Sequence, residues 1–77
     1  MAVKAFILIE AEVGVSGHVA QKIRQLDDVK SVNAVIGPYD IIAVVEVAEF
    51  DMVNGLVDKV HSVSGVCKTT TLLCVKP

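Results

Sequence analysis

V-K-A-F-I-L-I-E, at residues 3–10, has the pattern of a β-strand that is apolar on both faces. Successive side chains of a strand point to opposite faces, so this stretch divides into two sets. One face carries Val3, Ala5, Ile7 and Ile9, and the other carries Phe6 and Leu8. A sheet with one face in water would instead alternate apolar with polar residues. We therefore expect both faces of this strand to be covered.

The stretch I-I-A-V-V-E-V, at residues 41–47, has the same two-faced pattern. Its two faces carry Ile41, Ala43, Val45 and Val47 on one side and Ile42 and Val44 on the other. The 77 residues contain only enough helix to cover one face of a sheet built from such strands. We expect a second copy of the chain to cover the other face.

Length and composition indicate one small domain, residues 1–77, that gains burial by association. A chain this short is near the lower limit at which a single core is stable alone. Its hydrophobic fraction of 53% and mean hydropathy of +0.63 are high for a small soluble protein. No apolar run approaches the ~18 residues of a membrane span, and the amino terminus lacks the pattern of a secretion signal. We therefore expect a cytoplasmic protein with no membrane partner.

Charge and aromatic content argue against direct binding of nucleic acid. The formal net charge is -2, and the seven Lys and Arg residues are scattered along the chain. Phosphate binding requires concentrated positive charge, and base stacking requires more aromatic rings than Phe6, Tyr39 and Phe50. Neither C-x-x-C nor H-x-x-x-H occurs, so the sequence predicts no metal site and no cofactor.

A doubled unit predicts the fold. Shifting the sequence by 37 residues aligns apolar positions: Ile7 with Val44, Leu8 with Val45, Val19 with Leu56, Ile23 with Val60, Leu26 with Val63 and Val29 with Val66. Each half then reads strand, helix, strand, and two such units make a ferredoxin-like βαββαβ fold. Right-handed crossovers place both helices on one face of a four-stranded antiparallel sheet. The predicted class is α+β, with the bare face available for a sheet-to-sheet dimer.

The expected helices span residues 16–27 and 50–63. Gly14 and Ser16 supply turn and cap chemistry at the start of the first helix, and Ser64-Gly65 ends the second. The second helix is expected to bury Phe50, Val53, Leu56, Val57 and Val60. Strands are expected at 29–36, 40–47 and 66–75, with the tight turn Gly37-Pro38-Tyr39 joining the first two as a hairpin.

Two polar features interrupt the apolar strands. In the first, Gly37-Pro38-Tyr39-Asp40, backbone N–H groups and the Asp40 carboxylate are suited to the carboxylate and ammonium of a ligand. The same residues are equally explained by the hairpin itself. In the second, Thr69 and Thr71 share a strand face and offer hydroxyl hydrogen bonds, although threonine also favours strands. No phosphate loop, nucleophile elbow or acid pair beside a base occurs, so we expect no enzyme activity.

These features carry a family resemblance. The stretch V-I-G-P-Y-D-I-I-A-V-V-E-V at residues 35–47 resembles the signature hairpin of the Lrp/AsnC effector-binding (RAM) domain of feast/famine regulators. The stretch G-V-C-K-T-T-T-L-L at residues 65–73 is similar to the closing strand of that domain. The likeness covers essentially all 77 residues. The helix-turn-helix domain of the full-length regulators is missing from this sequence, as we interpret it. The chain therefore resembles the stand-alone members of this prokaryotic family.

The resemblance implies a homodimer with sheets packed face to face, and dimers joined into octameric or decameric rings. Family members bind amino acids between dimers and regulate transcription. The implied ligand-binding residues are Gly37, Tyr39, Asp40, Thr69 and Thr71. Pro38 departs from the usual charged or polar residue, removes one backbone donor and leaves the amino-acid specificity open. Without a DNA-binding domain, such a chain would act by mixed assembly with full-length Lrp/AsnC regulators or by docking to another protein.

Two alternatives remain at the level of sequence. One is a structural assembly subunit without an effector, because a bare sheet face requires a partner and not a ligand. The other is a small enzyme of the dimeric α+β barrel type, for which the strands offer only Glu10, Asn33 and Glu46. A deep pocket around a buried Glu46 or His61 would favour the enzyme.

Overall fold

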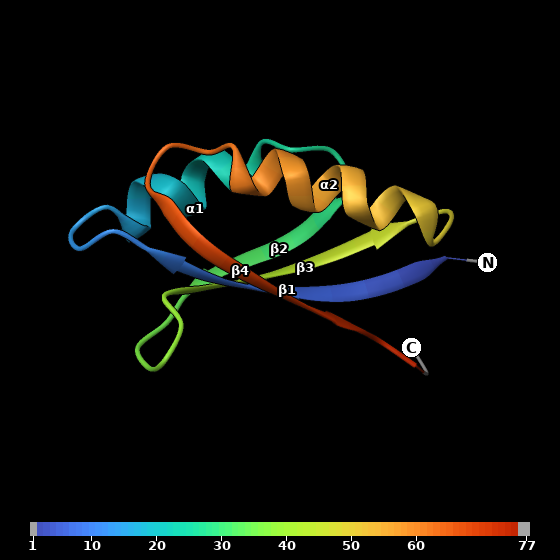
Figure 1. Cartoon of the computed structure of the whole chain (residues 1–77), viewed down its shortest axis with the longest axis horizontal. Helices are drawn as coiled ribbons and strands as arrows, with labels where there is room; N and C mark the ends of the chain where they lie inside the picture. Colours follow the sequence, from blue (N-terminus) through green and yellow to red (C-terminus); the bar gives the residue numbers. More distant parts are fainter. Residues whose placement is uncertain (1, 76–77) are drawn as a thin grey trace.

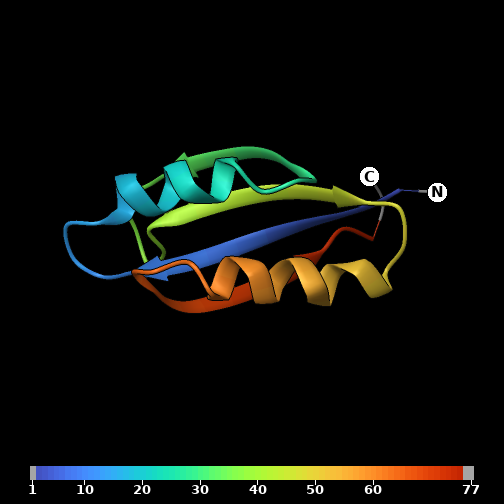
Figure 2. The same cartoon turned by 90° about the horizontal axis from the view of Figure 1, so that it is seen from above.

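The computed structural model describes residues 2–75 and has the predicted βαββαβ order. Its elements are β1 (Val3–Ala11), α1 (Ser16–Arg24), β2 (Val29–Ala34), β3 (Ile41–Val47), α2 (Asp51–His61) and β4 (Val66–Leu73). The strands form one sheet in the order β2-β3-β1-β4, and every neighbouring pair is antiparallel. Both helices lie on one face of this sheet (Figure 1) and run in opposite directions (Figure 2). The predicted fold class is confirmed.

The core lies between the two helices and the sheet. On the central strands, alternate residues reach zero exposure, as Ile7, Ile9 and Val45 do. The helices contribute residues spaced three or four apart, which form one stripe on each helix. Those buried stripes consist of Val19, Ala20 and Ile23 on α1, and of Val53, Leu56 and Val60 on α2. The apolar periodicity of the sequence therefore accounts for this face of the sheet.

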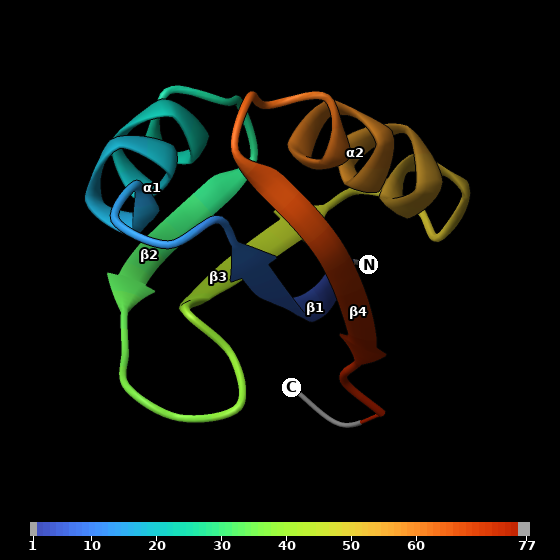
Figure 3. The same cartoon turned by 60° about the vertical axis from the view of Figure 1, so that its left-hand side comes forward.

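The opposite face of the sheet is not covered by any described segment (Figure 1). Phe6 and Leu8 point to it from β1, and Ile42 and Val44 point to it from β3. All four side chains are only half-buried. The loop between β2 and β3 lies on this side of the sheet, away from the helices (Figure 3). Below, we call this surface the open face.

Helix α1 begins at Ser16 as predicted but ends at Arg24 rather than residue 27. The backbone N–H of Leu26 donates to the carbonyl of Ile23 three residues earlier, which tightens and ends the last turn. Asp28 then adopts a φ of 71°, and the chain reverses into β2. The predicted capping role of Ser16 is wrong, because Val15 occupies the N-cap position and no side chain caps this helix.

Helix α2 spans Asp51–His61, within the predicted range of 50–63. Phe50 was predicted to be buried, and this is wrong, since its side chain is 57% exposed. It occupies the N-cap position, ahead of the stripe that faces the sheet. Gly65, in the turn after α2, has a φ of +99°, and a Cβ there would lie 2.9 Å from a methyl of Val19. This glycine allows the turn to pack closely on α1.

The connection between β2 and β3 is longer than the tight turn predicted. Strand β2 ends at Ala34 instead of residue 36, and β3 begins at Ile41. The six residues between them close through one hydrogen bond, from the Val35 N–H to the Asp40 carbonyl, at 2.8 Å. Strand β4 likewise ends at Leu73 instead of residue 75. The antiparallel hairpin is confirmed, but its tip is a broad loop.

The internal repeat holds for the helices and for Val29 with Val66, which both pack against the core, and it fails by one residue for β1 and β3. Val19 and Leu56, related by the shift of 37, are both buried. The same shift relates Leu8 to Val45, yet Leu8 lies on the open face and Val45 is fully buried under the helices. Strand faces alternate with a period of two, so an odd shift exchanges them.

Candidate functional site

Asp40 anchors the β2–β3 loop to the end of β1. Its Oδ2 accepts a hydrogen bond from the backbone N–H of Ala11 at 2.8 Å, and its own N–H donates to the carbonyl of Ile9 at 2.9 Å. The register of β1 against β4 shifts between Glu10 and Ala11, so Ala11 is at an irregularity that needs such an acceptor. The Asp40 carboxylate therefore has a structural role, which was one of the two sequence interpretations.

The other two predicted residues of the loop are close to Asp40 in sequence. Gly37 has a φ of 156° and no neighbouring atom within 4 Å of its added Cβ position, so it lies on an open part of the loop. Tyr39 is half-buried and directly precedes the anchoring Asp40. Both residues belong to the β2–β3 loop, which lies on the side of the open face (Figure 3).

The two predicted threonines point toward the helices. Thr69 pairs with Ile9 and Thr71 pairs with Ile7, and directly paired residues share a face. Both threonines are half-buried, since β4 is an edge strand that the helices cover incompletely. Thr70 pairs with Leu8 and points to the open face instead. The predicted sharing of one face by Thr69 and Thr71 follows directly from this register.

Asp40 and Thr69 lie at the same end of the sheet, on opposite sides of β1. The Asp40 N–H binds the Ile9 carbonyl from the β3 side, and Thr69 pairs with Ile9 from the β4 side. Two strand spacings, about 10 Å, therefore separate them. None of the three pockets found in residues 2–75 is lined by both the loop residues and the threonines.

Thr71 lines a small pocket between α2 and β4. The pocket has a volume of about 200 Å³ and lies beside Phe50, Val53, Asn54, Val57, Thr71 and Leu73. Its wall is mainly apolar, with one amide and one hydroxyl as polar groups. Drug-sized ligands occupy about 300–1,000 Å³, so this pocket suits a smaller molecule. Sequence reasoning missed Asn54, although its position four residues after Phe50 places both on one side of the helix.

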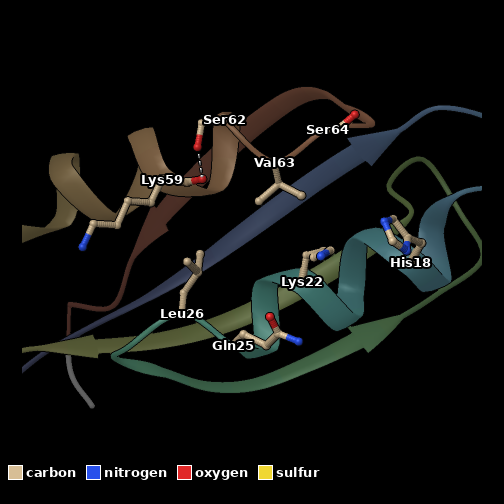
Figure 4. A pocket seen from close by; sticks show the side chains of 8 residues that line it. All are labelled: His18, Lys22, Gln25, Leu26, Lys59, Ser62, Val63 and Ser64. Carbon is tan, nitrogen blue, oxygen red and sulfur yellow. Dashed lines mark hydrogen bonds between the residues drawn. The ribbon is translucent and has the colours of Figure 1, made fainter.

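A larger groove of about 470 Å³ runs between the helices on the outer surface. Leu26 and Val63 point toward one another across it, while Lys22 and His18 line the α1 side (Figure 4). The Ser62 hydroxyl donates to the Lys59 carbonyl at 2.7 Å and so caps the end of α2. None of the five predicted ligand-binding residues lines this groove. The polar side chains that line this groove are exposed, so the groove is a shallow surface feature between the two helices.

The described residues contain no buried polar or charged side chain. Glu10 and Glu46 are half-buried on the open face, and Asn33 and His61 are exposed. None of these four residues lines a pocket between the sheet and the helices, where the alternative enzyme would keep its polar cavity. Across residues 2–75, no three His, Cys, Asp or Glu side chains converge as a metal site would require. None of the helices in that range is long and apolar enough to cross a bilayer.

The chain belongs to the family described as the Lrp/AsnC ligand binding domain, whose model matches residues 4–77. This assignment agrees with the βαββαβ order and with the four-stranded antiparallel sheet. The resemblance seen in the two sequence stretches is thereby confirmed.

Relatives of the chain are transcriptional regulators. It is 31% identical over 72 residues to the HTH-type transcriptional regulator FL11 of Pyrococcus furiosus, a match that covers 94% of this chain and 48% of FL11. The chain therefore spans about half the length of this curated relative. The matched region of this relative is consistent with the ligand binding domain that the family model describes.

Two solved structures show the fold in other proteins. The crystal structure of TTHA0845 from Thermus thermophilus has a TM-score of 0.91 and 30% identity, and the match covers 97% of this chain and 95% of that one. The transcriptional regulator NMB0573 of Neisseria meningitidis, solved as a complex with L-Met, has a TM-score of 0.84 and 21% identity. That match covers 96% of this chain and 50% of the regulator, and it supports the fold alone.

Proposed function

We propose that residues 1–77 form a single cytoplasmic amino-acid-sensing and oligomerisation module of transcription regulation, without enzyme activity. The observation that carries the proposal is the separation of Asp40 from Thr69 and Thr71 by β1, combined with the family match. Asp40 and Thr69 lie at one end of the sheet, whereas Thr71 pairs with Ile7 near the middle of β1 and lines the α2–β4 pocket. A site that is incomplete in one protomer and complete between protomers links binding to assembly.

In this proposal, two copies pack their open faces together, and dimers assemble into an octamer or a decamer. The effector, a small amino acid, binds between subunits against Gly37, Tyr39, Asp40, Thr69 and Thr71. L-Met in the NMB0573 complex supports an amino acid as the ligand class. In this proposal, the module acts on DNA through mixed assembly with full-length Lrp/AsnC regulators. Binding needs no metal or cofactor.

Calorimetric titration with the twenty amino acids, on protein whose mass is known from light scattering, tests the proposal. We expect one amino acid or a few related ones to bind, and to change the assembly mass. The absence of binding heat for all twenty amino acids at millimolar concentrations would contradict effector binding. A monomer at micromolar concentration would contradict the assembly on which the site depends.

Matched threonine variants make the titration specific to the site. Thr71→Val removes a hydroxyl that lines the α2–β4 pocket and keeps the side-chain shape. Thr70→Val makes the same change one residue away, on the open face. We expect Thr71→Val to weaken effector binding by about tenfold, the effect of one lost hydrogen bond. Equal effects of the two substitutions would place the effector elsewhere.

A structural assembly subunit without an effector is the second candidate. The observation that favours it is the bond from the Ala11 N–H to Asp40 Oδ2, because it already gives this carboxylate a structural role. Under this alternative, the light-scattering mass is that of an oligomer and is the same with and without amino acids. The titration and the mass measurement together separate the two functions.

A further inference from the structure

One row of four side chains along β1 has opposite charges at its two ends. Ala5, Ile7 and Ile9 are fully buried under the helices, so the alternate residues Lys4, Phe6, Leu8 and Glu10 point to the open face. The Lys4 Nζ lies 5.6 Å from the centroid of the Phe6 ring, which places both side chains on the same face. The row therefore reads cation, apolar, apolar, anion.

This row is complementary to itself when it is reversed. If a second copy faces the first with β1 antiparallel, each Lys4 meets a Glu10, and each Phe6 meets a Leu8. In a two-fold symmetric dimer, each such pair occurs two times. If the two strands are parallel, each Lys4 meets another Lys4 and each Glu10 meets another Glu10. Like charges brought together in an interface are strongly unfavourable.

The neighbouring strands keep the charges at the ends of the open face. Lys4 is paired with Glu46 on β3, and Glu10 is paired with Lys68 on β4. The side chains between these two ends are uncharged, and Val44 and Leu72 are examples on either side of Phe6. The open face thus has an uncharged middle with a charged pair at each end. Each end then has no net charge, so a preference for one orientation comes from the direct opposition of Lys4 and Glu10 along β1, while the middle provides apolar contact area.

We propose that Lys4 and Glu10 determine how two copies of this chain dock, by holding β1 antiparallel to β1 of the second copy. This inference rests on the face-to-face association in the proposed function. Packed sheets lie about 10 Å apart with strand directions within about 30°, a gap that lysine and glutamate side chains can span at the ends of the row. Within one chain, Lys4 and Glu10 are about 20 Å apart, so any contact between them is between copies.

A charge-exchanged chain tests the orientation. In the double variant Lys4→Glu, Glu10→Lys, antiparallel docking is again complementary between two variant chains. The variant and the wild type, however, then place like charges together at both ends. We expect an equimolar mixture, with one chain isotope-labelled, to contain at least about tenfold fewer mixed dimers than random assortment gives, measured by native mass spectrometry.

The control exchanges the same charges away from the open face. Lys22 on α1 and Glu49 before α2 are both exposed, so Lys22→Glu, Glu49→Lys is matched in charge. We expect this control to mix randomly with the wild type. Random mixing of the Lys4, Glu10 exchange would overturn the proposal. An excess of mixed dimers would also overturn it, because parallel docking predicts that result.

Cross-linking of the wild type gives a second readout that requires no variant. A carbodiimide joins a lysine to a carboxylate only when they are in contact. In a mixture of labelled and unlabelled protein, we expect a Lys4–Glu10 linked peptide of hybrid mass. A dimer that yields no such peptide overturns the orientation and leaves the proposed function standing. A protein that remains monomeric overturns both.

Discussion

The two faces of the sheet are built from alternate residues of the same strands, yet only one is sealed. On the helix side, Ile7 and Ile9 are fully buried and no charge is present among the buried residues. On the open face, Phe6 and Leu8 are half-buried between Lys4 and Glu10. Apolar residues on one face of the sheet form the core, and apolar residues on the other face stay available for contact with another chain. In our proposal, the charged ends distinguish the face that meets a second copy from the face that meets the helices.

The largest expected effect is on the sealed face. Ile7→Asp places a carboxylate in a fully buried position without a partner, which costs several kcal/mol out of a total stability of ~5–15 kcal/mol. We expect a chain that is unfolded at every concentration by circular dichroism. The control Ile7→Val should cost only about 1 kcal/mol. A folded Ile7→Asp chain would show that the helices do not seal this face.

The adjacent position on the open face should respond differently. Leu8→Asp puts a charge into the proposed contact between copies, so we expect dissociation to a folded monomer. Sedimentation equilibrium measures the mass, and circular dichroism measures the retained fold. Val45→Asp, one strand away, should instead behave like Ile7→Asp, because Val45 lies under the helices. A dimeric and equally stable Leu8→Asp chain would show that the open face is not the contact.

Substitutions at two glycines on the helix side should change the stability in opposite directions. Gly65→Ala combines a φ of +99° with a clash against Val19, and we expect a loss of about 2 kcal/mol in chemical denaturation. Gly55 lies within α2, with open space around its Cβ position. Gly55→Ala should therefore stabilise the protein by up to about 1 kcal/mol. Effects of the same sign at both positions would contradict the close packing of α1 on this turn.

The smallest expected effect is at the loop that extends past the open face. Asp40→Ala removes the acceptor of the Ala11 N–H bond and should cost about 1 kcal/mol. Asp40→Asn keeps a carbonyl oxygen in that place and should cost less, while it removes the negative charge offered to a ligand ammonium. We expect Asp40→Asn to lose effector binding and keep its melting temperature. Retained binding in this variant would mean that Asp40 is only an anchor.

Much of the fold was predictable from alternation and periodicity. The two central strands were recognised because each has apolar residues on both faces over a run of five residues, 5–9 in β1 and 41–45 in β3. The helices were recognised from stripes such as Val19 and Ile23 on α1, or Leu56 and Val60 on α2. These patterns are local consequences of backbone geometry, so they can be read without knowing what packs against them.

The errors of prediction occur where distant contacts decide the outcome. Phe50 is apolar and in phase with α2, but its exposure depends on how far the sheet extends beneath the helix start. The 37-residue shift aligned Leu8 with Val45, but Leu8 lies on the open face and Val45 is buried under the helices. Local patterns indicate that a residue is apolar and do not indicate which of two layers receives it.

In the candidate site, too, local spacing was predictable from the sequence and long-range contacts were not. Thr69 and Thr71 could be placed on one face from their spacing, and the register confirms that geometry. The Asp40 anchor could not be foreseen, because it joins a side chain to the N–H of Ala11, 29 residues away. Asn54 was missed because nothing in the sequence connects a polar residue of α2 with a threonine on β4.

The sequence by itself determined the order of the strands and helices, the two-faced character of β1 and β3, and the family resemblance, since each depends on neighbours along the chain. Only the tertiary structure decided which apolar face became the core, where the β2–β3 loop is anchored, and that the row from Lys4 to Glu10 lies on the uncovered side. The reason is physical: burial and register result from contacts between segments far apart in sequence, and a linear pattern does not specify those contacts.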